Sequence, residues 1–319
     1  MHALVTGGAG FIGSHLCDSL AQRNWEITIL DNLSSGSIEN IQHLLKQTPR
    51  KVKLVKGDCT NALHVKKALK NVEVVFHFAA NPEVRLELSD AQTCFQQNIY
   101  ATYTLLQQLR NNQETHTIIF PSTSTVYGEP KTIPTPENYA PLQPISLYGA
   151  SKLACEALIS AYAHNYNFKT IIYRLANIVG PRSKHGVIYD FIQKLKRNPK
   201  GLEILGDGTQ NKSYLYITDC IQAILTGLEK SKSRVEIFNV GSEDQINVKT
   251  IAKLIIEEAK LKNVKLIYTG GVDGGRGWKG DVKNMLLDIS KLKSFGWKPE
   301  FKSEQAIRKA TKHLMTQRT

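Results

Sequence analysis

The stretch TGGAGFIG, residues 6–13, decides how the chain begins to fold. It follows the apolar run ALVTG, residues 3–7, and leads into a segment with helical periodicity that extends to about residue 23. Its glycines fit G-x-G-x-x-G, counted from Gly8, and also G-x-x-G-x-x-G, counted from Gly7. Glycines at these spacings permit a tight turn through which the backbone approaches a pyrophosphate, whose oxygens then bind N–H groups at the start of the next helix. The stretch therefore predicts a strand, a phosphate-binding turn and a helix.

An acidic residue stands where a dinucleotide-binding turn needs one. Asp31 ends the next strand candidate, EITILD at residues 26–31, and lies 18 residues after Gly13. A carboxylate in this place accepts hydrogen bonds from both ribose hydroxyls of NAD, and it repels the additional phosphate of NADP. Together with the turn, Asp31 predicts an NAD-binding unit.

The first half of the chain continues to alternate between strand and helix patterns. This alternation favours an α/β fold, a doubly wound parallel sheet of the Rossmann type. The further strand candidates are VKLVKGD (52–58), VEVVFHFAA (72–80), HTIIFPST (116–123) and KTIIYRL (169–175), and the helical patterns between them include ALHVKKALK (62–70) and NIYATYTLLQQLR (98–110).

The second half is less regular and predicts a smaller C-terminal lobe. Residues 130–144 hold five of the eleven prolines, so we expect an ordered, non-helical loop there. We assign residues 1–176 to an NAD-binding Rossmann domain and residues 177–319 mainly to a substrate-binding lobe, with residues 214–245 returning to the Rossmann domain. Helices are expected near 187–197, 218–229 and 247–259, and loops at 206–213 and 270–277.

Composition narrows the class of protein. The 319 residues are 41% hydrophobic and 22% charged, and no apolar run approaches the length of a membrane span. The five cysteines are scattered singly, which argues against a disulfide framework or a zinc site, so we expect a cytoplasmic protein without a metal. The net charge of +13 is spread over amphipathic helices and indicates a basic surface that attracts anionic small molecules, rather than a nucleic-acid-binding protein.

The heptapeptide SLYGASK, residues 146–152, places a tyrosine one helical turn before a lysine. Residues four apart share one face of a helix, so Tyr148 and Lys152 should point the same way. An ammonium beside a phenol favours the phenolate and lowers the pKa of the phenol from its usual value of about 10. The pair therefore predicts a proton acceptor that works near neutral pH.

Three features at the ends of later strands have two readings each. Asp58 has two compatible readings, as a contact to the adenine edge of the dinucleotide and as the N-cap of the next helix. The small residues of FHFAAN (76–81) either let a flat cofactor lie across the strand ends or simply allow close packing. His77 is read as a core histidine rather than a metal ligand, because no second ligand lies at a suitable spacing.

These features occur together with further segments over essentially the whole chain. In combination they resemble the NAD-dependent epimerase/dehydratase family of the extended short-chain dehydrogenases/reductases, and within it the nucleotide-sugar epimerases. The further segments are STSTVYG (122–128), RLANIVGPR (174–182), GDGTQNKSYLYITD (206–219), FNVGS (238–242) and RGWKGDV (276–282).

The resemblance implies roles for individual residues. It makes Tyr148 the catalytic base, Lys152 the group that lowers its pKa, and Thr123 the hydroxyl that binds the reacting sugar oxygen. The residues implied to bind NAD are Gly7, Gly10, Phe11, Ile12, Gly13, Asp31, Asn32, Ser35, Gly36, Asp58, Cys59, Phe78, Ala79, Ala80, Asn98, Tyr148 and Lys152. Those implied to bind substrate are Arg85, Thr123, Tyr148, Asn177, Val187, Lys212, Tyr214 and Arg276.

Two of the implied ligands depart from the family pattern. The segment around Lys212 usually carries arginine at that position, and a lysine keeps the charge but lacks the bidentate fork. Arg276 is also placed differently from its counterpart in familiar epimerases. Met285 falls where the family admits or excludes N-acetylated sugars, and a methionine there does not identify the sugar.

The implied activity is NAD-dependent C4 epimerisation of a nucleotide sugar, a UDP-sugar of the glucose and galactose type, by a homodimer. Alternatives within the family are a uronic acid epimerase, a decarboxylase and a 4,6-dehydratase. Arg85 bears on the uronic acid, since it either faces a substrate carboxylate or is a surface residue. Family dehydratases follow the threonine with an acidic pair, where this chain has Ser124 and Thr125. An alternative of another class is a non-catalytic dinucleotide sensor.

Overall fold

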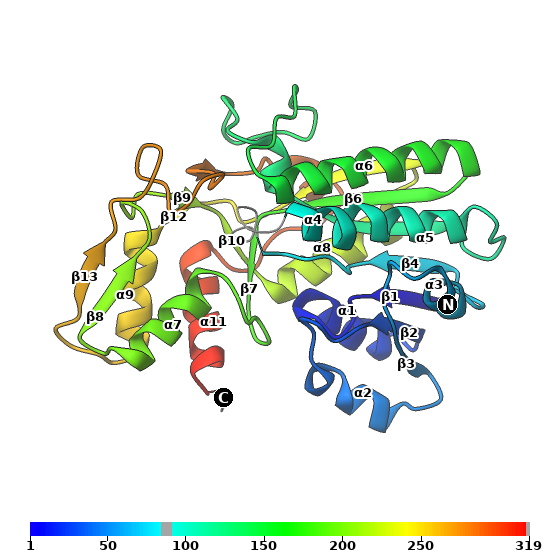
Figure 1. The fold of residues 1–319 in the computed structure, drawn as a ribbon, viewed down its shortest axis with the longest axis horizontal. Helices are drawn as coiled ribbons and strands as arrows, with labels where there is room; N and C mark the ends of the chain where they lie inside the picture. The colour runs from blue at the N-terminus through cyan, green and yellow to red at the C-terminus, as the bar shows by residue number, and fades with distance from the viewer. Residues whose placement is uncertain (84–90, 317–319) are drawn as a thin grey trace. The chain divides into compact units, whose positions relative to one another are not determined.

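The computed structural model of the protein describes residues 1–83 and 91–316 (Figure 1). Arg85 lies outside the described residues. The chain forms two compact units, which are described separately. The first unit comprises Met1–Val126, Leu147–Arg174 and Ile224–Phe238, and the second comprises Tyr127–Ser146, Leu175–Ala223 and Asn239–Thr319. The assignment of NAD to residues 1–176 and of substrate to residues 177–319 stays a prediction.

A seven-stranded sheet in the order β11-β6-β5-β4-β1-β2-β3 forms the centre of the first unit. The strands from β3 through β2, β1 and β4 to β5 pair in parallel, and the strand order reverses beside β1, as in doubly wound sheets. The predicted fold class is thus confirmed. The strands are β1 (His2–Thr6), β2 (Glu26–Asp31), β3 (Val52–Lys56), β4 (Val74–His77), β5 (Thr117–Thr123), β6 (Lys169–Leu175) and β11 (Val235–Val240).

Helices fill the connections between these strands. In Figure 1, α5 and α6 run side by side, and they also pack together. The helical pattern predicted over 98–110 is helical as far as Leu109, but its first part is not an α-helix, because Phe95–Tyr100 form a π-helical segment, η3, that runs into α5. The helices are α1 (Phe11–Gln22), α2 (Gln42–Gln47), α3 (Ala62–Ala68), α4 (Ala91–Cys94), α5 (Ala101–Leu109), α6 (Leu147–Tyr166) and α8 (Ile217–Lys230), with short 3-10 turns at Ile38–Asn40 and Ser124–Tyr127.

The apolar strands explain why this sheet forms. Leu4 of β1, Leu30 of β2, Val75 of β4 and Ile118 of β5 are all fully buried in one cluster with side chains of α3, α5 and α6. A parallel sheet covered on both faces reads as nearly continuous apolar runs, as these strands do. Each such side chain contributes about 1.5–3 kcal/mol by leaving water. The core thereby fixes the strand ends, where the glycine turn and Thr123 lie, and the helix α6 that carries Tyr148 and Lys152.

The second unit is built from short strand pairs and helices. Its helices α7, α9 and α11 pack on one another. Residues 130–144 form no helix, as predicted. The predicted loop at 206–213 contains a short strand. Helix α11 was not predicted. The strand groups are β7 (Asn177–Val179) with β10 (Tyr214–Tyr216), β8 (Gly201–Ile204) with β13 (Lys265–Tyr268), and β12 (Ile246–Asn247) with β9 (Asn211–Lys212) and β14 (Asn284–Met285), and the helices are α7 (Val187–Arg197), α9 (Val248–Glu258), α10 (Ser290–Ser294) and α11 (Ser303–Thr316).

None of the helices that the structure describes is long and apolar enough to cross a membrane.

Candidate active site

The glycine turn between β1 and α1 has the geometry that a pyrophosphate site needs. Gly7 has a φ of +67°, and a Cβ there would lie 2.7 Å from the backbone nitrogen of Ala79. A Cβ on Gly13 would lie 2.3 Å from the carbonyl oxygen of Gly7. Gly10 is the N-cap of α1 and brings no side chain to its first turn, so the N–H groups of Phe11 and Ile12 are not capped from that position. This cradle fits the pyrophosphate of NAD.

The carboxylate of Asp31 is buried at the end of β2 and bonded to the turn. Its Oδ2 accepts from the backbone N–H of Ala9 at 2.9 Å, and its Oδ1 accepts from that of Leu33 at 2.8 Å. Each carboxylate oxygen has a second lone pair, which leaves capacity for ribose hydroxyls. A Cβ on Gly36 would lie 3.0 Å from the backbone carbonyl carbon of Ala9. Gly36, which follows Ser35 in the chain, therefore packs against the glycine turn.

Asp58 does not cap the next helix. The N-cap of α3 is Asn61, whose side chain accepts from the backbone N–H groups of Leu63 and His64. Asp58 instead accepts from Thr60 and, at 2.8 Å, from the side chain of Asn32. Burial opposes ionisation of Asp58, but these hydrogen bonds outweigh it and hold the pKa of the carboxyl below its usual value. The reading of Asp58 as a cap is therefore wrong, and its link to Asn32 joins two residues predicted to bind NAD.

The segment after β4 packs directly against the glycine turn. Phe78, Ala79 and Ala80 are half-buried, and the backbone N–H of Ala79 donates to Thr6 Oγ1 at 3.1 Å. Close packing at this strand end is thus observed, and contact with a flat cofactor stays a prediction. Cys59 is buried nearby, and burial, then the charge of Asp58, raises the pKa of its thiol to about 12, so it stays protonated.

His77 is a core histidine, as predicted. Its Nδ1 lies 2.8 Å from Thr6 Oγ1 and its Nε2 lies 3.0 Å from Thr102 Oγ1. Burial, followed by the charge of Lys152, lowers the pKa of the imidazole to about 3. The ring is therefore neutral at physiological pH and joins β1, β4 and α5.

The three predicted catalytic residues all belong to the first unit. Thr123 is the last residue of β5, and its hydroxyl lies 3.1 Å from that of Thr125. Tyr148 lies in the first turn of α6 and Lys152 one turn later, with its Nζ 4.1 Å from the centroid of the Phe120 ring. Since Phe120 lies on β5 as well, the strand that carries Thr123 also contacts the lysine.

Burial changes the acid–base picture of this pair. The expectation that Lys152 lowers the pKa of Tyr148 is wrong for the protein alone, because burial, followed by Cys155 and Cys94, raises the pKa of the phenol to about 12. Burial also lowers the pKa of the Lys152 ammonium to about 8, against opposing contributions of Cys155 and Glu156. An apolar environment disfavours the charged form of both groups.

Asn98 connects the segment after β4 to helix α6. It lies in the π-helical segment and is 2% exposed. Its Oδ1 accepts from the backbone N–H of Asn81 at 2.8 Å, and its Nδ2 donates to Ser151 Oγ at 2.9 Å. Ser151 in turn donates to the carbonyl oxygen of Tyr148 at 2.8 Å. The amide of Asn98 thus joins residues predicted to lie near the cofactor to the helix that carries the predicted base.

The predicted substrate ligands that the structure describes outside Thr123 and Tyr148 fall in the second unit. Asn177 on β7 donates to the carbonyl oxygen of Ser213 at 3.1 Å. Tyr214 on β10 is buried, which raises the pKa of its phenol and keeps it neutral. Val187 begins α7 and is half-buried. Lys212 Nζ lies 2.5 Å from the carboxylate of Asp281.

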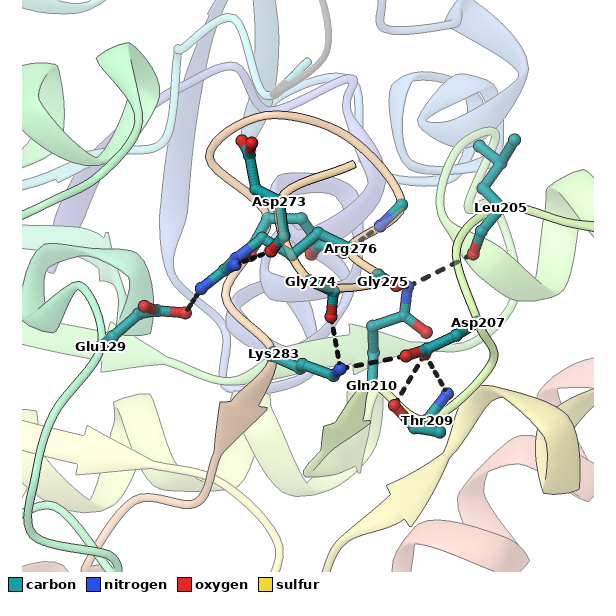
Figure 2. A network of polar contacts seen from close by, with 12 residues as sticks. Glu129, Leu205, Asp207, Thr209, Gln210, Asp273, Gly274, Gly275, Arg276 and Lys283 are labelled. Carbon is teal, nitrogen blue, oxygen red and sulfur yellow. Dashed lines mark hydrogen bonds and ion pairs between the residues drawn. The ribbon is translucent and has the colours of Figure 1, made fainter. Parts of the chain in front are cut away.

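Arg276 belongs to a polar network in the glycine-rich loop of the second unit (Figure 2). Its guanidinium pairs with Glu129, donates to the carbonyl oxygen of Asp273, and donates through Nε to that of Asp281 at 3.1 Å. Figure 2 also shows Lys283, which binds the carbonyl oxygen of Gly274 at 2.7 Å and so fastens the same loop. Arg276 is therefore held by several partners, and its contact with a diphosphate stays a prediction.

Sequence reasoning missed one group of buried polar residues beside the predicted catalytic residues. Ser122, Glu156 and Arg174 are each less than a tenth exposed and bond to one another. The available signal was helical spacing, because Glu156 lies four residues after Lys152 and eight after Tyr148. A second signal was the arginine inside the apolar strand KTIIYRL.

A parallel sheet with a glycine turn after its first strand and an acidic residue after its second defines a dinucleotide-binding α/β protein. A family model described as "NAD dependent epimerase/dehydratase family" matches residues 3–241. The chain belongs to this family of nucleotide-sugar epimerases and dehydratases, and its cofactor is NAD.

Relatives named as epimerases and as dehydratases are both similar to this chain. A provisionally named UDP-glucose 4-epimerase of Methanocaldococcus jannaschii is 35% identical over 311 residues, which cover 96% of each chain. Human dTDP-D-glucose 4,6-dehydratase is 32% identical over 312 residues, which cover 96% of this chain and 87% of the human one.

A solved structure is similar over nearly the full length of the chain. UDP-glucuronic acid 4-epimerase from Bacillus cereus, in complex with UDP-glucuronic acid and NAD, is 29% identical, with 99% of both chains covered and a TM-score of 0.88. The Rossmann-type fold predicted from the sequence agrees with this similarity.

Proposed function

We propose that the protein interconverts the C4 epimers of a UDP-sugar of the glucose and galactose type. The observation that carries the proposal is the sequence that follows the predicted catalytic threonine. Thr123 ends β5 and is followed by Ser124 and Thr125, in the unit that also carries Tyr148 and Lys152. This set can move a proton at a sugar hydroxyl but lacks the acidic pair with which family dehydratases eliminate water.

Each of the three residues has a distinct part in the proposed reaction. Tyr148, once deprotonated, takes the proton from the C4 hydroxyl, and Thr123 holds that oxygen by a hydrogen bond. The pKa of Lys152 is about 8, so at pH 7 its side chain is mostly a cation that stabilises the phenolate. The chemistry that bound NAD would supply is reversible hydride acceptance at C4, and the glycine turn and Asp31 would hold the cofactor. General-base assistance of this kind is worth about 10²–10⁴-fold in rate.

Between the two hydride transfers the sugar ring has to rotate so that its other face receives the hydride. The nucleotide has to keep the substrate bound during this rotation. We assign this task to the predicted ligands of the second unit, with Lys212 and Arg276 as the cations for the diphosphate. Binding energy at a part of the substrate that does not react is what retains such an intermediate. Asn177, Val187 and Tyr214 complete the proposed nucleotide site.

The closest competing function is C4 epimerisation of UDP-glucuronate. The similarity to the Bacillus cereus enzyme supports it as a second candidate. A 4-keto uronic acid can also lose carbon dioxide, which links this candidate to the decarboxylases. A dehydratase fits less well, because the hydroxyls of Ser124 and Thr125 are poor general acids near pH 7. A dinucleotide sensor without activity would not need Tyr148, Lys152 and Thr123 together.

One experiment separates these candidates. The purified protein with its NAD is incubated separately with UDP-glucose, UDP-N-acetylglucosamine and UDP-glucuronate, and the products are resolved by chromatography and weighed by mass spectrometry. An isomer from UDP-glucose of unchanged mass supports the proposal. A main product lighter by water would assign a dehydratase, and one lighter by carbon dioxide would assign a decarboxylase. An isomer from UDP-glucuronate alone would assign the uronic acid epimerase, and no product from any sugar would favour the sensor.

We also propose that the protein is a cytoplasmic homodimer that associates through helices α5 and α6. Tyr100, Tyr103 and Tyr166 on or beside these helices are between 40% and 43% exposed, and their rings offer apolar surface to a second subunit. Light scattering on the purified protein gives the mass that tests this state, and a monomer would contradict it.

A further inference from the structure

A buried ion pair joins helix α6 to two strands of the sheet in the first unit. The side chains of Arg174 on β6 and Glu156 on α6 are 3% and 5% exposed. Arg174 donates through Nη2 to Glu156 Oε2 at 2.8 Å, and through Nε to both carboxylate oxygens at 3.1 and 3.2 Å. The hydroxyl of Ser122 on β5 donates to Oε1 of the same carboxylate. One carboxylate on the helix is thus held by donors from two neighbouring strands.

This cluster is adjacent in the chain to all three predicted catalytic residues. Glu156 lies one helical turn after Lys152 and two turns after Tyr148, so the three side chains share a face of α6. Ser122 immediately precedes Thr123 on β5. A shift of α6 along or around its axis would therefore break the cluster and move Tyr148 relative to Thr123.

Stability alone does not account for the ion pair. Removing two charges from water is costly, and a buried pair replaced by well-packed apolar residues often leaves a protein equally stable or more stable. The directional hydrogen bonds, in contrast, specify one rotation and one height of the helix against the strands. The ion pair is therefore better explained by the placement of helix α6 than by stability.

We propose that Glu156 and Arg174, together with Ser122, are positioning residues for the proposed reaction. They hold the Tyr148 and Lys152 face of α6 in register with Thr123 on β5, and they keep a balanced pair of charges one turn from Lys152. The inference rests on the proposed function for its kinetic consequence, but its structural and electrostatic consequences are independent of the sugar.

The effect of the Glu156 and Arg174 charges on the pKa of Tyr148 can be measured. The ionisable groups that interact with Lys152 are Cys155 and Glu156 of α6 and His77 of β4. Those that interact with Tyr148 are Cys155 and Cys94 of α4. Arg174 of β6 is linked to both through Glu156. The side chains that η3, β5 and α5 bring to this cluster are the uncharged Asn98, Phe120 and Thr102. Loss of the Glu156 charge removes one negative charge from the surroundings of Lys152 and Tyr148, and the more positive potential favours the phenolate of Tyr148.

The first test is spectroscopic and uses the purified protein with its bound NAD. The parent, Glu156→Gln and the double variant Glu156→Gln/Arg174→Gln are each titrated by phenolate absorbance, and the same protein with Tyr148→Phe is subtracted. The pKa of Tyr148 is expected to fall in Glu156→Gln and to return towards the parent value in the double variant. The same pKa in all three proteins would overturn the electrostatic part of the proposal.

The second test is kinetic and includes a variant that keeps the ion pair. Ser122→Ala removes only one hydrogen bond, and the double variant removes both charges without leaving one unpaired. For proteins with parent-like melting temperature and NAD content, kcat is expected to fall, by up to about 10²-fold in the double variant, with KM nearly unchanged. The matched control is Arg23→Gln/Glu229→Gln, which removes a surface ion pair of the same unit and should leave kcat unchanged.

Parent kcat in both Ser122→Ala and the folded double variant would overturn the positioning role. If the parent acts on no sugar, the proposed function fails instead, and the phenolate titration still decides whether the pair acts on Tyr148.

Discussion

The carboxylate of Asp31 accepts a hydrogen bond from the backbone N–H of Ala9 over 2.9 Å. This bond joins the end of β2 to the glycine turn between β1 and α1. The residue predicted to select the ribose therefore also helps to shape the turn predicted to bind the pyrophosphate. One acidic side chain thus couples the conformation of the turn to the choice of cofactor.

We predict that the parent binds NAD much more tightly than NADP, and that Asp31→Ala narrows this preference without abolishing NAD binding. Removing the carboxylate removes repulsion of the 2′-phosphate and one acceptor for the ribose, so the ratio of dissociation constants should shrink by roughly 10- to 100-fold, about 1.4–2.7 kcal/mol. Calorimetry with both cofactors measures it. Asp58→Ala is the control and should keep the preference, whereas equal constants in the parent would contradict the assignment.

Tyr148→Phe should retain the fold and bound NAD but lose turnover by at least about 10²–10⁴-fold, the usual worth of a general base. Phenylalanine preserves the ring packing and removes only the ionisable oxygen. The measurement is turnover of the accepted UDP-sugar, with NAD content checked after release from the protein. Tyr103→Phe, on an exposed tyrosine of α5, is the control and should match the parent. Parent-like turnover in Tyr148→Phe would show that Tyr148 is not the base.

The direction of the pKa shift of Tyr148 could not be predicted from the sequence. The spacing of Tyr148 and Lys152 predicts a shared helical face, but the environment of a phenol depends on side chains distant in the sequence. Cys94 of α4 interacts with the phenol, and the ring of Phe120 on β5 contacts Lys152 one turn further along α6. The resulting burial raises the pKa that the lysine alone would lower.

Local patterns predicted the first unit well because its signals are local. The glycine turn, the acidic residue after β2 and the apolar strands each depend on a few neighbouring residues. The π-helical segment at Phe95–Tyr100 contains neither proline nor glycine, so its sequence does not distinguish a π-helix from an α-helix. The pair of Glu156 and Arg174 joins residues 18 apart, and only the fold shows that they meet.

The stability of the protein should fall in acid through His77. Its pKa is about 3 in the folded protein against a usual 6.5, so below pH 6.5 the unfolded state binds more protons. The free energy of unfolding should therefore decrease by about 1.4 kcal/mol for each pH unit between about 6 and 3 from this residue. Urea unfolding at several pH values, compared with His77→Gln, isolates the contribution. Parallel pH profiles for the two proteins would show that His77 is not the cause.

The last prediction compares two lysines of the second unit that differ in the burial of their partners. Lys212 pairs with Asp281, whose side chain is 2% exposed, whereas Lys283 pairs with Asp207, whose side chain is 34% exposed. Lys212→Met leaves a buried carboxylate without its cation and should cost about 3–5 kcal/mol in the free energy of unfolding. Lys283→Met should cost about 0–1 kcal/mol, because water screens an exposed pair. Urea unfolding measures both. If Lys212 also holds the diphosphate, Lys212→Met should weaken UDP binding in calorimetry while Lys212→Arg preserves it, since arginine keeps the charge. Equal losses of stability in the two methionine variants would mean that burial of Asp281 does not set the strength of its ion pair.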